Sequence, residues 1–303
     1  MPGIKTFIPC IALALLSPIA LAQSQNAAAP HLADLAQAQN GGKNPKPSLA
    51  ATDYSKQPFV MELISSKMAF ENDGTSTSEV SVRVPIQSQA GLQALGLLSF
   101  PYPSAVDSMD ILHVRVTKPD QRVIETPLEN VLEMPTEITR QAPFYSDMKE
   151  KQVAVKGLEV GDTLEFSRRE HLHTPLDPGQ FWYTYSFFHA GIALEETFEI
   201  SVPLERYVKV ESPKYPPVIT ELGSYKIYIW KTANLEVKDE KAESTAADEE
   251  ANRPSIQLTS FRDWNEVGKW ISSLFVPREA ISPEIQQKAN EITRGANTDA
   301  EKI

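Results

Sequence analysis

Two histidines, His171 and His173, have the spacing of a metal-binding pair on a strand. Residues two apart on a strand project to the same face, so their imidazoles could share one cation. A third ligand would have to come from elsewhere, with His189, Glu195 and Glu196 as candidates. Because nothing in the spacing requires that ligand, we expect exposed or hydrogen-bonded histidines and no bound metal or cofactor. A metal enzyme built on this pair is the less favoured alternative.

A second candidate is a run of aromatic residues, made of Phe181, Trp182, Tyr183, Tyr185, Phe187 and Phe188. On one strand they would occupy both faces, which is more than a single core face requires. One face is expected to be core. The other face, with Trp182 and Phe188, either packs under a second layer or a downstream domain, or forms a stacking surface for a sugar or peptide. We favour packing and keep ligand binding as the alternative.

Common catalytic and nucleotide-binding motifs are missing from the sequence. It has no Gly-x-x-x-x-Gly-Lys or Gly-x-Gly-x-x-Gly loop to hold a phosphate, and no Gly-x-Ser-x-Gly or His-Glu-x-x-His motif of hydrolases. The single cysteine, Cys10, lies in the apolar leader. We therefore predict no catalytic residue and no cofactor in this chain.

The first residues have the pattern of a secretory signal. Lys5 precedes an apolar run over residues 7–21, and the small residues Ala20 and Ala22 form a cleavage site. The run is too short to remain as a membrane anchor, and no later stretch is long enough to cross a bilayer. Residues 1–22 are thus expected to be removed, leaving a periplasmic or secreted protein without a membrane span.

The composition excludes one class of partner. The chain has 29 basic and 40 acidic residues, a net charge of -11, and the loss of Lys5 makes it one unit more negative. Such a charge repels phosphate backbones, so nucleic acid is not an expected partner. The length allows one large or two ordinary domains.

Most of the chain has the two-residue period of strands. The alternating apolar positions include Val80, Val82 and Val84, then Leu112, Val114 and Val116, and then Phe198, Ile200 and Val202. Turn sequences separate these runs, at Asn72-Asp73-Gly74, Lys118-Pro119-Asp120, residues 157–162 and Asp177-Pro178-Gly179. Short alternating strands without helices between them predict a mainly β chain, with an antiparallel β-sandwich over residues 58–236.

Two segments of low complexity flank this domain. Residues 23–57 contain mainly Ala, Gln, Asn, Gly, Lys and Pro, and are expected to form a flexible linker. Residues 237–254 are rich in Asp and Glu and are expected to be an acidic disordered loop or linker. A calcium site in the acidic segment is disfavoured, because the ligand order of a calcium loop is missing.

The pattern changes in residues 255–303. A last strand is predicted over residues 256–259, followed by a helix that Asp263 and Glu266 open. A second helix is predicted from Ser282 to Gly295. These helices form a short α-helical segment after the β domain.

The last residues predict one more helix. Thr298 and Glu301 have the spacing of a capping box, in which each side chain bonds the backbone of the other residue. A capping box is useful only where a helix follows it. We therefore expect this chain to be a fragment of a longer protein.

Several motifs together resemble a known family. They are Phe70-Glu71-Asn72-Asp73-Gly74, Pro85-Ile86-Gln87-Ser88, the run from His113 to Asp120, His173-Thr174-Pro175-Leu176, Gly179-Gln180-Phe181-Trp182, and Phe261-Arg262-x-Trp264. The sequence resembles the β domain of unknown function (family 3857) that precedes a transglutaminase-like core in secreted bacterial proteins. The resemblance covers nearly all of residues 59–303. One departure is Gln121, where the family usually has Gly.

This resemblance implies a function and a partner. The helical segment looks like the start of a papain-like transglutaminase domain, whose Cys, His and Asp would lie further downstream. The chain would then be a noncatalytic front part that positions or shields that domain, which is its expected partner. A stand-alone periplasmic module that binds glycan or peptide through Trp182 is the alternative from another class.

Overall fold

The structure is a computed structural model of the whole chain. It describes Tyr54, residues 57–144, 146–235, 254–279 and 281–296, and the single residues Thr298 and Glu301. The expected signal peptide at residues 1–22, nearly all of the expected linker at residues 23–57, and residues 237–253 of the acidic segment lie outside the described residues.

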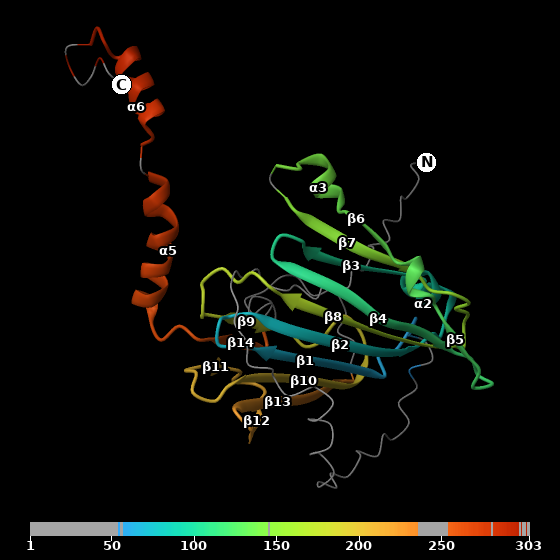
Figure 1. Cartoon of the computed structure of the whole chain (residues 1–303). Helices are drawn as coiled ribbons and strands as arrows, with labels where there is room; N and C mark the ends of the chain where they lie inside the picture. Colours follow the sequence, from blue (N-terminus) through green and yellow to red (C-terminus); the bar gives the residue numbers. More distant parts are fainter. Residues whose placement is uncertain are drawn as a thin grey trace, which may run out of the picture. The chain divides into compact units, whose positions relative to one another are not determined.

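The described residues form mainly strands, with few helices (Figure 1). The strands are β1 (Leu63–Phe70), β2 (Ser76–Pro85), β3 (Leu97–Pro103), β4 (Asp107–Thr117), β5 (Val123–Glu125), β6 (Leu132–Pro135), β7 (Met148–Ala154), β8 (Thr163–Leu172), β9 (Trp182–Tyr185), β10 (Ala193–Pro203), β11 (Lys209–Glu211), β12 (Val218–Leu222), β13 (Tyr225–Asn234) and β14 (Ile256–Thr259). The helices are α2 (Gln89–Leu95), α3 (Glu137–Gln141), α5 (Trp264–Glu279) and α6 (Pro283–Ile292), with a 3-10 turn at Leu128–Asn130. The prediction of a mainly β chain is confirmed.

The chain divides into two units, residues 1–260 and 261–303. An eight-stranded sheet dominates the first unit, in the order β12-β13-β10-β1-β2-β8-β4-β5. All its neighbouring strands are antiparallel except β1 and β10, which run parallel, with Ile64 opposite Glu196. The prediction of a purely antiparallel arrangement is wrong at this pair. Because β1 and β10 are distant in sequence, the long intervening chain allows a parallel pairing that a short hairpin cannot make.

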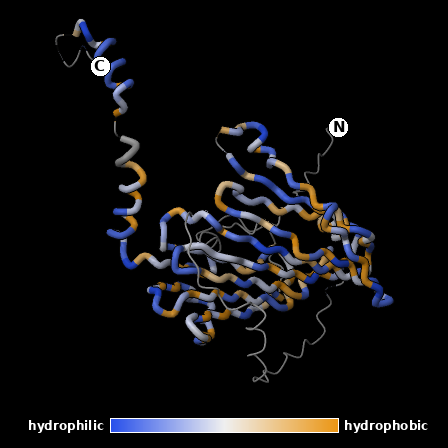
Figure 2. The backbone as a smooth tube through the Cα atoms, in the orientation of Figure 1, coloured by the Kyte–Doolittle hydropathy of each residue, from blue (hydrophilic) through white to orange (hydrophobic). Residues whose placement is uncertain are grey.

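One face of the large sheet is buried, and we call it the inner face. Hydrophobic and hydrophilic residues alternate along its strands (Figure 2). As predicted, Val80, Val82 and Val84 are buried on β2, and Phe198, Ile200 and Val202 are buried on β10. In the sheet registers Ile64 lies opposite Val82, and Phe198 opposite Trp230, so these buried side chains share one face.

Strand β4 departs from strict alternation. A register shift between Ile111 and His113 marks a β-bulge. Val114 and Val116 are buried as predicted, but before the bulge the buried residues are Asp107, Met109 and Ile111, and Leu112 is only half-buried. The prediction that Leu112 belongs to the apolar face is wrong, because the extra residue of the bulge reverses the order of inward and outward side chains.

The sheet β3-β7-β6 covers one part of the inner face. The first core cluster lies between them and includes Leu98, Phe100, Tyr102 and Val153 of the small sheet with Val82, Val84, Val114, Val116, Leu164 and Phe166 of the large sheet. Apolar residues from both layers thus exclude water from the central strands β2, β4 and β8.

The sheet β11-β14-β9 covers another part of the inner face, near β10 and β13. The second core cluster is rich in aromatic rings: Tyr185 stacks on Phe198 with ring centroids 3.9 Å apart, and Phe198 stacks on Trp230 at 5.7 Å. The predicted last strand, β14, lies between β9 and β11 and pairs with both. Residues far apart in the sequence therefore form this sheet.

Glycines at two predicted turns hold a conformation that other residues rarely adopt. Gly74 has a φ of +91° and Gly179 a φ of +76°. A Cβ atom at Gly74 would lie 2.8 Å from the carbonyl oxygen of Gln180, so these two turns approach each other closely. Gln121 also has a positive φ, of 67°, although it is not glycine.

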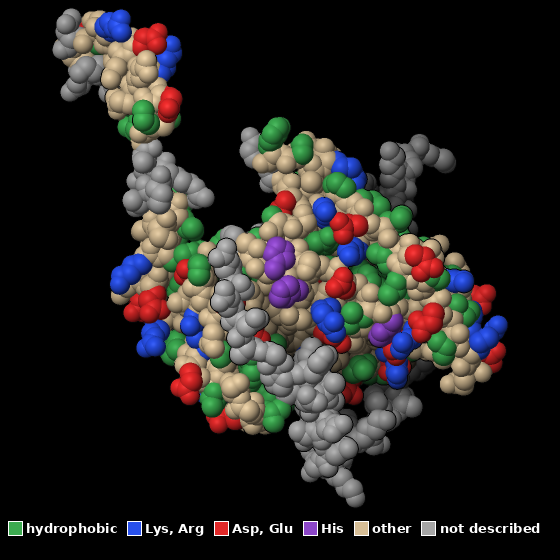
Figure 3. All heavy atoms as spheres, viewed as in Figure 1, with side chains coloured by type: hydrophobic (Ala, Val, Ile, Leu, Met, Phe, Trp, Pro, Cys, Tyr) green, Lys and Arg blue, Asp and Glu red, His purple; other side chains and the backbone are tan. Residues whose placement is uncertain are grey.

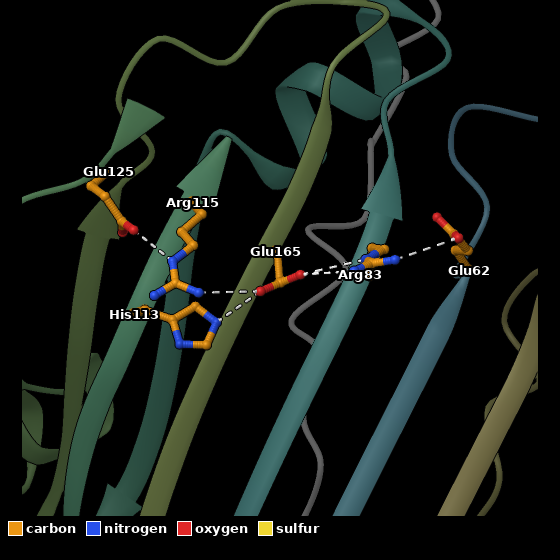
Figure 4. A network of polar contacts seen from close by, with 6 residues as sticks. All are labelled: Glu62, Arg83, His113, Arg115, Glu125 and Glu165. Atoms are coloured by element: carbon orange, nitrogen blue, oxygen red, sulfur yellow. Dashed lines mark hydrogen bonds and ion pairs between the residues drawn. The ribbon is translucent and has the colours of Figure 1, made fainter. Parts of the chain in front are cut away.

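The outer face of the large sheet carries charged side chains (Figure 4). Glu165 lies 3.3 Å from Arg83 Nη2, 3.3 Å from His113 Nε2 and 3.7 Å from Arg115 Nη1. At the two ends of this network Arg83 pairs with Glu62 at 3.8 Å and Arg115 with Glu125 at 2.6 Å. Acidic and basic side chains are also interspersed over the face of the molecule that Figure 3 displays.

The second unit contains α5 and α6 with the caps that the sequence predicts. Asp263 Oδ1 accepts from the amides of Asn265 at 2.8 Å and Glu266 at 3.0 Å. Ser282 accepts from the amide of Ile285 at 3.3 Å. Both bonds of the final capping box are present: the Glu301 amide donates to Thr298 Oγ1 at 3.3 Å, and the Thr298 amide donates to Glu301 Oε2 at 3.2 Å. None of the helices in the described residues is long and apolar enough to span a bilayer.

Candidate functional site

A small crevice opens at the inner face of the large sheet, where β1 and β8 end and β2 and β4 begin. Its volume is about 30 Å³. It is lined by Met68, Phe70, Ser76, Ser78, Asp107, Glu170, Leu172, Phe181, Trp182 and Tyr183. We call it the Asp107 crevice. Buried charges, hydroxyls and aromatic rings meet in this crevice.

The sheet registers place its polar residues in two adjacent rows. Ser76 and Asp107 both lie opposite Leu172, on either side of β8. In the next row Ser78 lies opposite Glu170. Since neighbouring strands are about 4.8 Å apart, these side chains project from one small area of the sheet.

Asp107 is the least expected member of the site. Its exposed fraction is 6%, and the carboxylate has no hydrogen bond or ion pair with any residue that the structure describes. Burial, and then the negative charge of Asp147, raises the pKa of Asp107 from 3.8 to about 6. At neutral pH the crevice thus contains a carboxylate that is largely ionised and poorly compensated.

A buried ion pair lies next to Asp107. Arg168 Nη1 pairs with Glu170 Oε1, and the two residues are 6% and 8% exposed. The Arg168 guanidinium also lies 5.7 Å from the ring centroid of Phe100. Burial lowers the pKa of Arg168 to about 10, so the guanidinium stays charged at neutral pH. Arg168 therefore balances one of the two carboxylates, and the crevice keeps an excess negative charge.

Aromatic rings form the opposite wall. Phe181 stacks on Phe70 with ring centroids 4.2 Å apart, which fixes the segment before β9 against β1. Trp182 and Tyr183 follow directly and also line the crevice. Burial raises the pKa of Tyr183 to about 12, so its phenol is neutral. Aromatic rings and two carboxylates thus line the same crevice, and the negative charge of the carboxylates favours a positively charged group over an anion.

The structure separates the two aromatic residues that the sequence grouped as a contact surface. Trp182 begins β9 and lines the Asp107 crevice. Phe188 lies beyond the end of β9 and packs against the first core cluster. The Phe188 amide donates to Glu196 Oε2 at 2.8 Å. These two residues therefore do not form one surface.

The two predicted histidines lie on the opposite side of the sheet from the crevice. Their ring centroids are 6.4 Å apart and both residues are exposed, and Figure 3 shows two histidines side by side at the surface. Nδ1 of His171 lies 3.2 Å from the hydroxyl of Thr77, and Nδ1 of His173 lies 2.6 Å from that of Thr174. Within the described residues no three His, Cys, Asp or Glu side chains are grouped so as to hold a metal.

Among the lining residues, sequence reasoning missed Asp107, Ser76, Ser78 and Glu170. Part of the signal was present, because Glu170 and Arg168 occupy the same alternate positions as the buried Leu164 and Phe166 on β8. Charged residues are rare at buried positions of the inner face unless they are paired or functional. The signal for Asp107 is hidden by the bulge in β4.

Comparison with known families decides where the chain belongs. The family described as a domain of unknown function with a solved structure, DUF3857, matches residues 72–238. This range is more than half of the chain and contains the residues that line the crevice from β2, β4, β8 and β9. The chain belongs to the DUF3857 family. The resemblance seen in the sequence is therefore confirmed for the family itself.

A solved structure shares the fold of this DUF3857 chain. A crystal structure described as "a putative protease from Parabacteroides distasonis" has a TM-score of 0.63 and 17% sequence identity, over 81% of this chain and 48% of the other. The DUF3857 chain thus spans about half the length of that protein. At this identity the likeness shows the fold alone.

A weaker likeness is found to an M1 zinc metallopeptidase from Deinococcus radiodurans. It has a TM-score of 0.33 and 12% identity, over 67% of this chain and 42% of the other, which carries no argument about this chain. No curated protein matches the DUF3857 chain.

Proposed function

We propose that this chain is the noncatalytic N-terminal β part of an exported bacterial transglutaminase-like protein, and that it positions or shields a downstream domain with a Cys-His-Asp site. The observation that carries the proposal is membership of DUF3857 together with the sequence motifs that resemble proteins of that arrangement. The fold likeness to a protein of about twice the aligned length is in keeping with a further domain.

The way the chain leaves the first unit supports a positioning role. β14 is hydrogen-bonded between β9 and β11, and the next residue, Ser260, donates its amide to Phe181 O at 2.9 Å. Ser260 Oγ in turn accepts from the Phe181 amide at 2.8 Å. A rigidly held exit point restricts where a following domain can lie.

Export and catalysis can be tested separately. N-terminal sequencing of protein recovered from the periplasm or medium should give Gln23 as the first residue. Purified residues 23–303 should neither incorporate a fluorescent amine into casein nor hydrolyse peptides. Turnover of either substrate by these residues would contradict the noncatalytic role, because the only cysteine of the chain, Cys10, lies outside them.

A second candidate is a peptide-binding module, and the Asp107 crevice favours it. Of the two ligand classes, glycan and peptide, a crevice of about 30 Å³ is better matched by one small group of a peptide than by a whole sugar ring. The chemistry of the lining, with Trp182 beside carboxylates, is better suited to a cationic group of a peptide. Trp182→Ala should weaken peptide binding without unfolding the protein, and a peptide array without any saturable binder would contradict this role.

A further inference from the structure

The Asp107 crevice contains polar groups without partners, and this is the starting point for assigning a ligand. Asp107 is 6% exposed and Ser76 is 3% exposed. Neither side chain, nor that of Ser78, makes a hydrogen bond within the described structure. Ser78 is half-buried. Buried polar groups in native proteins are nearly always hydrogen-bonded, so the two buried groups, Asp107 and Ser76, indicate a partner that the fold itself does not supply.

The charge of the crevice determines whether that partner is a cation or an anion. Asp107 has no cationic neighbour in ion-pair contact, and the guanidinium of Arg168 already pairs with Glu170. An anion would be repelled by the Asp107 carboxylate, whereas a cation is attracted by it.

The size and the acceptors narrow the partner further. A primary ammonium has three donors and no acceptor, and the carboxylate of Asp107 and the hydroxyls of Ser76 and Ser78 can all accept. A small crevice of about 30 Å³ is better matched by a compact ammonium than by a larger planar guanidinium. A divalent metal is disfavoured, because no three acidic, histidine or cysteine side chains are grouped in the described residues.

We propose that the Asp107 crevice binds a primary ammonium group, supplied either by a lysine side chain or by the amino terminus of a peptide. Asp107 is the ionic partner, the two serines accept the remaining hydrogen bonds, and Trp182 contacts the methylene next to the nitrogen. This inference deepens the peptide-binding role. It rests on that role for the larger ligand that carries the ammonium, but binding of the ammonium group itself does not depend on it.

Titration with small amines tests the ammonium site directly. The folded chain is titrated with methylamine while Trp fluorescence and amide chemical shifts are followed. Saturable shifts confined to the crevice residues are expected. Asp107→Asn should weaken binding about tenfold or more, because a charge-assisted hydrogen bond is lost. The matched control is Asp110→Asn, an exposed carboxylate on the same strand, which should bind like the wild type.

Further arms identify the source of the ammonium and guard against misfolding. Lysine methylamide acetylated on its α-nitrogen presents a side-chain ammonium, and glycinamide presents an α-ammonium. The ligand that binds more tightly identifies the source of the ammonium. Lysine acetylated on its side-chain nitrogen, with the α-amine blocked, should not bind. If Asp107→Asn does not fold, Ser76→Ala serves instead, with an expected weakening of about threefold.

The outcomes separate this inference from the peptide-binding role. Amine binding that depends on Asp107, without any peptide binder, would keep the ammonium site and remove the peptide role. Absence of methylamine binding, equal binding by Asp107→Asn, or preferential binding of calcium would overturn the ammonium site.

Discussion

Asp107 and Val114 point to the same face of β4 although their spacing along the strand is odd. The bulge between Ile111 and His113 makes this possible, because it adds one residue to β4 that β8 does not match. Val114 is fully buried in the first core cluster, and Asp107 is 6% exposed in the crevice. The bulge therefore places a carboxylate on the inner face of the sheet, where it lowers the stability of the fold.

Asp107→Asn is expected to stabilise the protein at neutral pH. The folded pKa of about 6 lies above the ordinary value of 3.8. Folding thus disfavours the ionised form, and the wild type loses stability as the pH rises from about 4 to 6 and then levels off. The amide carries no charge, so the variant should gain about 3 kcal/mol above pH 7 and nothing below pH 3.5. Urea unfolding at several pH values measures the difference.

The control for this prediction is again Asp110→Asn, since Asp110 is exposed on the outer face. Its stability should follow the wild type at every pH. The charged residues near Asp107, namely Asp147, Glu170 and Arg168, are unchanged in both variants. A constant difference between Asp107→Asn and wild type from pH 3 to 8 would contradict the pKa assigned to Asp107.

Tyr185→Phe tests a buried hydrogen bond beneath the second core cluster. The phenol of Tyr185 donates to Glu196 Oε1 at 2.7 Å, and Glu196 is 2% exposed. Without the phenol a buried carboxylate oxygen loses its donor, so the free energy of unfolding should fall by about 1–3 kcal/mol at neutral pH. Tyr183→Phe, two residues earlier on β9, is the matched control, because its phenol makes no hydrogen bond in the described structure.

The same variant should change the pH dependence of stability. Burial raises the pKa of Glu196, while the bonds from Phe188 and Tyr185 oppose that rise. Loss of the phenol therefore raises this pKa further. The destabilisation should be smallest in acid, where Glu196 is protonated in both folded and unfolded chains, and should grow as the pH rises. A larger loss in acid than at neutral pH would refute the assignment.

The sequence predicts the strands well wherever alternation is uninterrupted. The buried positions of β2 and β10 follow from their valines, isoleucines and phenylalanines, and the turn glycines Gly74 and Gly179 have the positive φ that their turns require. The parallel contact of β1 with β10 does not follow, because no local pattern encodes which distant strands become neighbours. Likewise, the three strands of the β11-β14-β9 sheet come from separate parts of the chain.

The site is predicted only in part, for a reason that the bulge makes clear. The aromatic run in the sequence indicates Trp182, which lines the crevice. The sequence does not indicate Asp107, because strict alternation counted back from Val114 places it on the outer face. A single inserted residue thus hides a buried carboxylate from pattern analysis. The pairing of Phe188 with Trp182 requires one continuous strand, whereas β9 ends at Tyr185.

Gln121→Gly should stabilise the hairpin between β4 and β5. Gln121 has a φ of 67°, which costs a residue with a Cβ about 1 kcal/mol. Glycine removes this cost but loses more entropy on folding, so a net gain of about 0.5 kcal/mol is expected. Gln121→Ala keeps the Cβ and serves as the control. Equal stabilities of the Gly and Ala variants in thermal unfolding would show that the backbone at this position is not strained.

Two isosteric substitutions on β8 should differ strongly in cost, because they lie on opposite faces of the sheet. Glu165 belongs to the outer network of Figure 4, and its side chain is 30% exposed. Arg83 and Arg115 keep their other partners, Glu62 and Glu125, when Glu165 is neutralised. Glu165→Gln should therefore lower the free energy of unfolding by less than about 1 kcal/mol, and by still less in 0.5 M NaCl.

Glu170→Gln is the contrasting change on the inner face. Glu170 is 8% exposed and pairs with Arg168, which is 6% exposed. Neutralising one partner leaves a buried guanidinium without its counter-charge, so a loss of about 3–5 kcal/mol is expected. Salt should change this loss little, because screening ions do not reach the interior. Urea unfolding could instead give similar losses of unfolding free energy for both variants, or the same dependence of these losses on salt. Either result would mean that the two faces do not differ in burial. The crevice could then not hold the uncompensated carboxylate on which ammonium binding depends.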